Sequence, residues 1–144
     1  MKRPNIVYLH SHDTGRYVQP YGHAVPTPNI QSLAEEGVLF RQGFCAAPTC
    51  SPSRAALLTG QCAHNSGMLG LAHRGFALAD CDHHLAQVLK GSGYRTVLAG
   101  VQHVAARVEN VGYDEVLEAE SRGAEAVSTA AAAFIDSKPE APFF

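Results

Sequence analysis

The chain lacks the features that mark several large classes of protein. It has no cluster of Lys or Arg, and 11 basic against 13 acidic residues give a formal net charge of −2. It therefore offers no basic surface for nucleic acid, and we expect no nucleic-acid partner. No apolar segment approaches the length needed to span a bilayer, so we expect no membrane partner. A hydrophobic content of 46% over 144 residues fits one globular, core-bearing domain.

The N-terminus also lacks an export signal. Two basic residues precede only the short apolar run 6–9, which His10 interrupts. That pattern is typical of a strand and not of a signal peptide, so we expect a cytoplasmic protein with reduced thiols. Three of the four cysteines, Cys45, Cys62 and Cys81, are predicted to be small buried packing residues.

What the sequence does contain is an alternation of apolar strands and amphipathic helices. Strands are expected at 5–11, 38–40 and 96–99. Helices are expected after Thr27, after Asp82 and over 121–136, with these inward-facing residues: Ile30, Leu33, Ala34, Leu85, Val88, Leu89, Val127, Ala130, Ala131 and Phe134. This order predicts an α/β fold with a mostly parallel or mixed sheet flanked by helices.

The last residues, 142–144, read as the start of another strand. We therefore interpret 1–144 as the N-terminal portion of a larger domain, or as an incomplete gene product. Three polar segments follow the expected strands: His12-Asp13, the loop at Cys50, and His103. Ligands of parallel sheets bind beyond the carboxyl ends of the strands, so we expect these segments to converge at one edge.

Cys50 stands at the start of a predicted helix. Ser51 is a favoured N-cap residue, Pro52 suits the first helical position, and Gly60 can end the helix. The free N–H groups and positive end of such a helix favour an anion beside the cysteine. The pattern therefore pairs a nucleophile with an anion-binding site.

The run C-x-P-S-R of residues 50–54, followed by Leu-Thr-Gly at 58–60, resembles the signature of the type I sulfatase family. Residues 3–7, 27–38 and 93–96 with His103 resemble further blocks of that family, so the similarity extends over most of 3–104. The resemblance implies an incomplete alkaline-phosphatase-like fold. It also implies a sulfatase that hydrolyses small-molecule or carbohydrate sulfate esters.

In that family the signature cysteine is oxidised to formylglycine by a maturation enzyme, which the resemblance implies as a partner. The hydrated aldehyde attacks sulfur and expels the alcohol, and its second hydroxyl then loses a proton as sulfate leaves. The resemblance assigns this role to Cys50. It also implies that Arg54 holds the diol or the sulfate, and that His103 binds the sulfate or the second hydroxyl.

The family also uses a divalent metal, generally calcium, held partly by two adjacent aspartates after the first strand. The corresponding pair here is His12-Asp13, and the metal site predicted by the resemblance comprises Asp13, His12 and the group at Cys50. Asp13 fits a hard cation. His12 departs from the pattern, because calcium prefers oxygen, so either His12 does not bind the metal or the site favours one such as manganese.

A second departure is Val101, which stands where sulfatases usually carry lysine; Arg16 is one candidate replacement. Two alternatives stay open at this point. The chain could derive from a phosphonate or phosphate ester hydrolase of the same superfamily, in which the changes at positions 12 and 101 reflect a different anion. It could also be a non-catalytic, truncated sulfatase-like domain.

Overall fold

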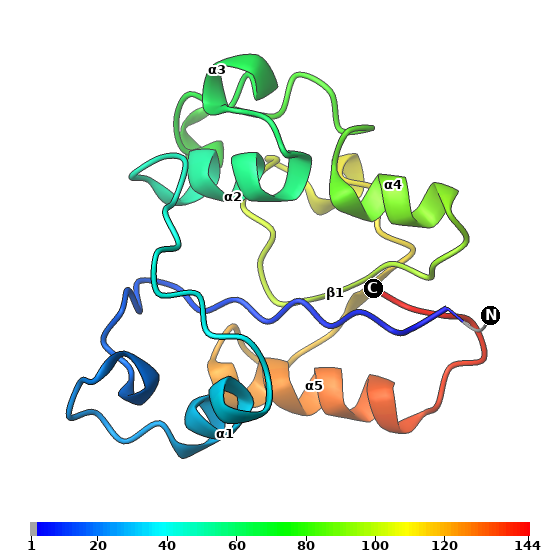
Figure 1. Ribbon diagram of the computed structural model, residues 1–144. Coiled ribbons are helices and arrows are strands. Elements are labelled where there is room, and N and C mark those ends of the chain that lie inside the picture. Colours follow the sequence, from blue (N-terminus) through cyan, green and yellow to red (C-terminus); the bar gives the residue numbers. More distant parts are fainter. Residues whose placement is uncertain (1–2) are drawn as a thin grey trace. The chain divides into compact units, whose positions relative to one another are not determined.

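The computed structural model describes residues 3–144, which form two compact units. The larger unit combines residues 3–7 with residues 45–144, and the smaller one consists of residues 8–44. Each unit is described by itself, and Figure 1 labels their helices and strands.

The larger unit is built on a short parallel sheet. Strand β1 (Val97–Ala99) pairs in parallel with β2 (Glu115–Leu117), with Leu98 opposite Val116. The segment 142–144 extends this sheet on the other side of β1, where Arg95 and Phe143 form a parallel bridge. The backbone N–H of Ile6 donates to the carbonyl of Phe143 at 2.8 Å, so the N-terminal segment adds an outer edge to the array.

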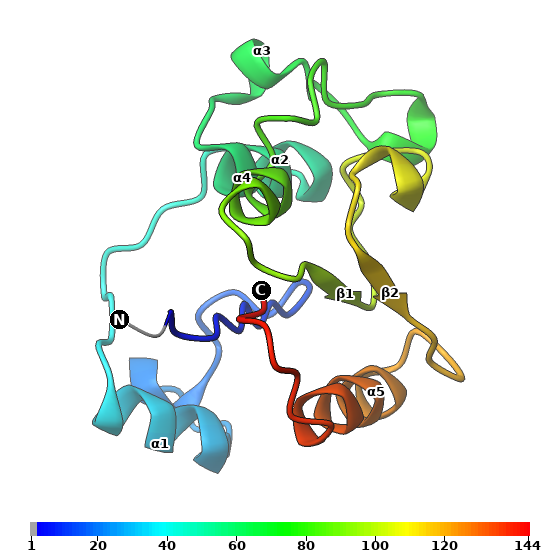
Figure 2. The ribbon, with the colours of Figure 1, turned by 90° about the vertical axis from the view of Figure 1, so that its right-hand side faces the viewer.

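Helices cover both sides of this sheet. Figures 1 and 2 show α2 (Cys50–Thr59) and α4 (Leu85–Gly91) on one side and α5 (Ala124–Asp136) on the other. The short helix α3 (Ala63–Ser66) follows α2, and single 3₁₀ turns occupy Ala72–Arg74 and Val108–Asn110. The prediction of an α/β fold with helices flanking a parallel sheet is confirmed. Among residues 3–144, none of the helices has the length and apolar character that crossing a bilayer requires.

The core of the larger unit involves α2 and the chain that follows α3 and β1. It contains buried residues from α2, from the chain between α3 and α4, and from the loop after β1: Ala55, Met68, Leu78, Val104, Ala105 and Val111. Met68, Val104 and Val111 are fully buried, and burying such a side chain contributes roughly 1.5–3 kcal/mol. Because Val104 belongs to this core, the preceding residue His103 is held at its margin.

The smaller unit contains a 3₁₀ turn at Gln19–Tyr21 and helix α1 (Pro28–Glu36). Its loop is closed by two reciprocal hydrogen bonds: the Gln19 N–H donates to Thr27 Oγ1 at 3.0 Å, and the Thr27 N–H donates to Gln19 Oε1 at 3.3 Å. The prediction of a helix after Thr27 is confirmed. The predicted burial of its apolar stripe is wrong, because α1 contains no buried residue and Leu33 is 66% exposed.

Two of the three predicted strands are absent as strands from the described residues. Neither 5–11 nor 38–40 is assigned as a strand, whereas the third prediction is confirmed by β1. A strand exists through a ladder of paired N–H and C=O groups, and an apolar pattern alone does not provide the neighbour. Leu9 and Val38 are 85% and 78% exposed, so these segments are not buried central strands.

Helices α4 and α5 start at residues other than those predicted, whereas Thr27 is the N-cap of α1 as predicted. The N-cap of α4 is His84, whose Nδ1 accepts a hydrogen bond from the Ala86 N–H at 3.1 Å. Asp82 lies earlier, in a turn where its N–H donates to Asp80 Oδ1. Helix α5 begins at Ala124 and not at 121, because the Ser121 hydroxyl accepts from the Gly123 N–H and holds residues 121–123 in a turn.

The cysteine predictions are partly wrong. All four cysteines are free thiols, as expected. Cys45 and Cys62, however, are exposed and do not pack in the core. Cys81 is half-buried against the core cluster, and this burial, with Asp80 and Asp82 beside it, raises the pKa of its thiol.

Candidate functional site

Cys50 is the first residue of α2, as the helix-mouth prediction required. The helix is longer by two residues at this end than expected, because its N-cap is Thr49 and not Ser51, and the Thr49 carbonyl accepts from the Ser53 N–H. Gly60 ends the helix in the left-handed conformation with φ +68°, as predicted. Cys50 is half-buried, so its thiol is held in place and can still be reached.

Ser51 does not cap the helix, and the prediction of that role is wrong. Ser51 lies inside the first turn, fully buried, and its Oγ accepts a hydrogen bond from the Ala72 N–H at 3.1 Å. This bond fastens the 3₁₀ turn Ala72–Arg74 to the first turn of α2. The residue after Cys50 is thereby linked to the residue before His73.

His103 is positioned by a loop with unusual backbone geometry. Its φ is +56°, in the left-handed region that few residues other than glycine occupy. The Gln102 side chain holds this conformation, since its Oε1 accepts from the N–H groups of Val104 and Ala105 and its Nε2 donates to the Ala105 carbonyl. A conformation that costs about 1–2 kcal/mol is retained because these bonds and the buried Val104 fix it.

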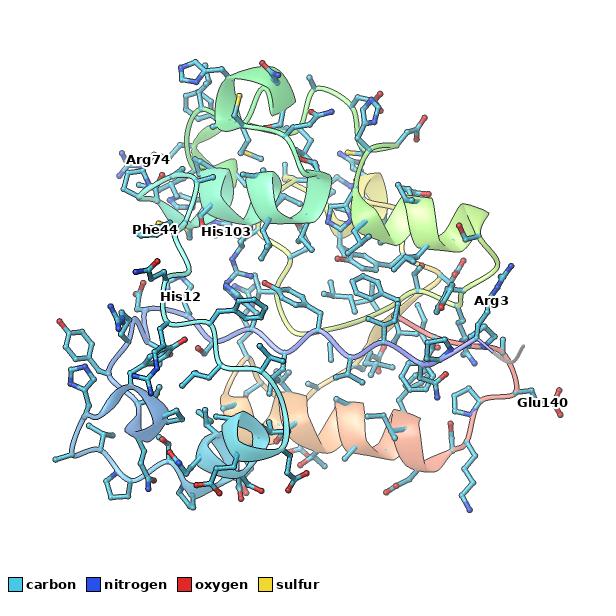
Figure 3. All side chains as sticks on the ribbon, viewed as in Figure 1. Arg3, His12, Phe44, Arg74, His103 and Glu140 are labelled. Carbon is cyan, nitrogen blue, oxygen red and sulfur yellow. The ribbon has the colours of Figure 1, made fainter. Side chains whose placement is uncertain are left out.

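The structure brings Cys50 and His103 together, 53 residues apart in sequence. Cys50 Sγ lies 3.2 Å from His103 Nδ1, which is hydrogen-bond distance for a sulfur atom. The other ring nitrogen of His103, Nε2, lies 3.1 Å from Nδ1 of His73. Figure 3 labels His103 and also Arg74, the residue that follows His73.

His73 is a site residue that sequence reasoning missed. The two imidazole rings are nearly parallel, with an interplanar angle of 6° and centroids 5.4 Å apart. With two of their nitrogens only 3.1 Å apart, these values place the rings edge to edge in one plane, hydrogen-bonded and not stacked face to face. Since His73 is one of eight histidines, no spacing rule singled it out; only the Ser51–Ala72 bond explains its position.

Arg54 lies one turn into α2, beside the same loop. Its Nη1 donates to the Val101 carbonyl at 3.0 Å, and its Nε is buried without a hydrogen-bond partner among the described residues. Position 101 thus takes part in the site through its backbone, whichever side chain it carries. A buried cationic donor with no partner costs about 1–3 kcal/mol or more, and an anion can satisfy it.

His12, Asp13 and Arg16 belong to the smaller unit. His12 Nδ1 lies 2.9 Å from Asp13 Oδ2, and the Asp13 side chain is 88% exposed, with a left-handed φ of +56°. Arg16 is engaged by a neighbour, since its guanidinium lies 5.1 Å from the centre of the Tyr21 ring.

The described donor groups do not make a metal site by themselves. Within residues 3–144, no group of three or more His, Cys, Asp or Glu side chains is arranged to hold a metal ion. Calcium takes six to eight oxygen ligands, whereas Asp13 supplies one carboxylate and its neighbour His12 an imidazole already paired with it. The metal site predicted at His12, Asp13 and Cys50 stays a prediction.

Comparisons with known proteins point to one family. The family model Sulfatase matches residues 4–135. An arylsulfatase of Klebsiella aerogenes is 33% identical over 113 residues, which cover 72% of this chain and 24% of the relative. Arylsulfatase H of Homo sapiens is 42% identical over 113 residues (71% and 20%), and the human N-sulphoglucosamine sulphohydrolase is 38% identical over 104 residues (69% and 20%).

The chain spans about a fifth to a quarter of the length of these curated relatives. The family match nevertheless covers nearly all of it, including Cys50, Arg54 and His103. The chain therefore belongs to the sulfatase family.

Proposed function

We propose that the full-length protein hydrolyses sulfate esters, with a formylglycine derived from Cys50 as the nucleophile. The observation that carries this proposal is the contact between Cys50 Sγ and His103 Nδ1, made at the first residue of a helix. A nucleophile within hydrogen-bond distance of a ring nitrogen is the arrangement that covalent catalysis requires. The sulfatase relatives support sulfate as the group transferred.

In this proposal, Cys50 is converted to formylglycine before the site can complete a catalytic cycle. A thiolate can attack sulfur, but the resulting adduct has no easy route to release sulfate. Formylglycine supplies, as its hydrate, one hydroxyl to attack and a second whose deprotonation releases the product. Because His103 Nδ1 already faces the side chain of residue 50, it can hold and accept a proton at that position.

Arg54 is the proposed anion-binding residue. Its Nη1 is fixed by the Val101 carbonyl, and its Nε is a buried donor that no described residue satisfies. A guanidinium recognises a sulfate oxygen through charge-assisted hydrogen bonds, which are about twice as strong as neutral ones. The free N–H groups of the first turn of α2 favour the same charge.

The substrate, the maturation enzyme and the metal are proposed by chemical class. The substrates would be small-molecule or carbohydrate sulfate esters, and a formylglycine-generating enzyme would have to act on Cys50. A divalent metal, calcium or manganese, would take an oxygen ligand from Asp13, with His12 beside it. We attach no step of the reaction to the metal, because the described ligands do not complete a site.

The test is turnover by the full-length protein, co-expressed with a maturation enzyme. We expect hydrolysis of an aryl sulfate to exceed that of the matching aryl phosphate. We also expect Cys50→Ala to lower the rate by about 10⁴-fold or more, as loss of a nucleophile does. Faster turnover of the phosphate ester would favour the phosphatase-like alternative, and undiminished activity of Cys50→Ala would remove Cys50 from the mechanism. No turnover of either ester would favour the non-catalytic alternative.

A further inference from the structure

His73 contacts the ring nitrogen of His103 that does not face Cys50. The three groups form a row in which His103 Nδ1 faces Cys50 Sγ at 3.2 Å and His103 Nε2 faces His73 Nδ1 at 3.1 Å. Both nitrogens of His103 are therefore engaged, on opposite edges of one ring. The coplanar placement of the His73 ring, with an interplanar angle of 6°, is the geometry of an in-plane hydrogen bond.

The position of His73 is built into the fold. Ala72 is 3% exposed, and its N–H donates to the buried Ser51 Oγ, so the turn that carries His73 is attached to the helix that carries Cys50. The turn is closed by bonds from the Arg74 N–H to the Leu71 carbonyl and from the Gly75 N–H to the Ala72 carbonyl. The imidazole of His73 is exposed, but its backbone is fixed on both sides.

The chemistry of these groups selects one arrangement of protons. In one arrangement of the contact at 3.2 Å, the Cys50 S–H donates to an unprotonated His103 Nδ1, which is also the arrangement that a proton acceptor at this position requires. In a neutral imidazole the proton then lies on Nε2, which donates to Nδ1 of His73. A neutral His73 then carries its own proton on Nε2.

We propose that His73 is a positioning residue of the sulfatase site: its Nδ1 accepts from His103 Nε2–H and keeps the unprotonated Nδ1 of His103 facing residue 50. This inference rests on the proposed function, in which the group at residue 50 gives up a proton. Without His73, the ring of His103 can exchange tautomers, and one of them presents N–H where an acceptor is needed.

The first test does not depend on turnover. In the full-length protein labelled with ¹⁵N-histidine, two-bond ¹H–¹⁵N correlation at about pH 8, where an unperturbed imidazole is neutral, reports which nitrogen of His103 carries the proton. We expect the Nε2–H form alone in the wild type and a mixture of both tautomers in His73→Leu. An Nδ1–H tautomer in the wild type, or an unchanged spectrum in His73→Leu, would overturn the proposal.

The second test separates positioning from structure. Asn places a side-chain oxygen near the position of Nδ1, so His73→Asn should keep both the Nε2–H tautomer and most of kcat. His73→Leu should lower kcat about 10-fold or more with little change in KM, as expected for a residue that orients another catalytic group. The matched control is His64→Leu, which removes an exposed histidine of α3 and should leave kcat unchanged.

These outcomes distinguish the two proposals. If the enzyme cleaves sulfate esters and His73→Leu matches the wild type in kcat, the role of His73 falls while the proposed function stands. If no sulfate ester is cleaved but the His103 tautomer changes as expected, the proposed function falls while the role of His73 in orienting His103 stands.

Discussion

The two segments that resemble sulfatase active-site blocks differ in how they are held. Around Cys50, the Ser51 hydroxyl accepts from the Ala72 N–H, 21 residues away in sequence, and the Gln102 side chain bonds to backbone groups of the His103 loop. Ser51 and Val104 are fully buried. Around His12 and Asp13, in the smaller unit, the two side chains pair with each other and stay 55% and 88% exposed. One segment is fixed by the core of its unit, and in the other the described side-chain contact is between sequence neighbours.

This difference bears on two roles, that of a proton acceptor and that of a metal ligand. A proton acceptor must be placed to within fractions of an ångström, and the Cys50–His103 pair meets that condition. A metal ligand on an exposed loop needs further ligands to fix it, and within residues 3–144 the Asp13 carboxylate is paired with the His12 ring.

The largest effect is expected from removing one imidazole in each region. His103→Ala should lower kcat of the full-length enzyme by about 10²–10⁴-fold, the contribution of a positioned acid or base. His12→Ala should lower it less, because its ring makes only an exposed contact with Asp13. Steady-state kinetics on both variants gives the ratio of the two losses in kcat. Far-UV circular dichroism shows whether each variant is folded. Equal losses would contradict the contrast between the two regions.

A second prediction concerns the pH dependence of stability in the larger unit. His84 is fully buried, and burial lowers its pKa from 6.5 to about 4. Between these values the unfolded chain binds a proton that the folded chain does not. The free energy of unfolding should therefore fall by roughly 3 kcal/mol as the pH drops from above 6.5 to about 4.

The measurement is denaturant unfolding at several pH values, in the wild type and in His84→Asn. Asparagine is also a good N-cap, so this variant keeps an acceptor for the Ala86 N–H while removing the titrating group. The variant should lose the part of the pH dependence between pH 4 and 6.5. An identical slope in both proteins would show that His84 is not its source.

A third prediction compares two hydroxyl groups. Ser51→Ala leaves the Ala72 N–H without its buried acceptor and should lower the free energy of unfolding by about 1–3 kcal/mol. Thr14→Ala removes an exposed hydrogen bond to Ser11 in the smaller unit and should cost no more than about 0.5 kcal/mol. Thermal unfolding of the two variants decides the point. A costlier Thr14→Ala would mean that the smaller unit is the more tightly held one.

The smallest effect is a change of metal preference. His12→Asp supplies a second carboxylate at the predicted ligand pair and should strengthen calcium binding relative to manganese, because calcium prefers oxygen and imidazole suits softer ions. Titration calorimetry with each ion alone, on wild type and variant, gives the two affinities. An unchanged ratio would argue that position 12 does not contact the metal.

Local signals in the sequence predicted the parts of the fold that local chemistry decides. The helix at Cys50, its end at Gly60 and the strand at 97–99 follow from a helix-favouring run, a left-handed glycine and a β-branched segment. The meeting of Cys50 and His103 was anticipated from the family blocks. The rule that parallel strands place their carboxyl ends together gave the same expectation, but the strand at 38–40 from which it placed Cys50 is not formed.

The failures are tertiary in origin. Ser51 has the residue type of a cap, but a buried bond to Ala72, 21 residues away, decides its role. The exposed residues Leu9 and Val38 have the pattern of strands, which only a pairing neighbour can complete. His73 could not be distinguished from the five other histidines that matched no family block, because its importance comes from a turn that is fastened to α2.

The central claim is that the thiol at the mouth of α2 is a precursor and not the final nucleophile. The most direct measurement is the mass of the peptide that contains Cys50, from full-length protein co-expressed with a formylglycine-generating enzyme. Conversion of the thiol to the aldehyde should lower that mass by about 18 Da, whereas peptides containing Cys45, Cys62 or Cys81 alone should keep theirs. An unchanged mass at Cys50 under those conditions would contradict the account.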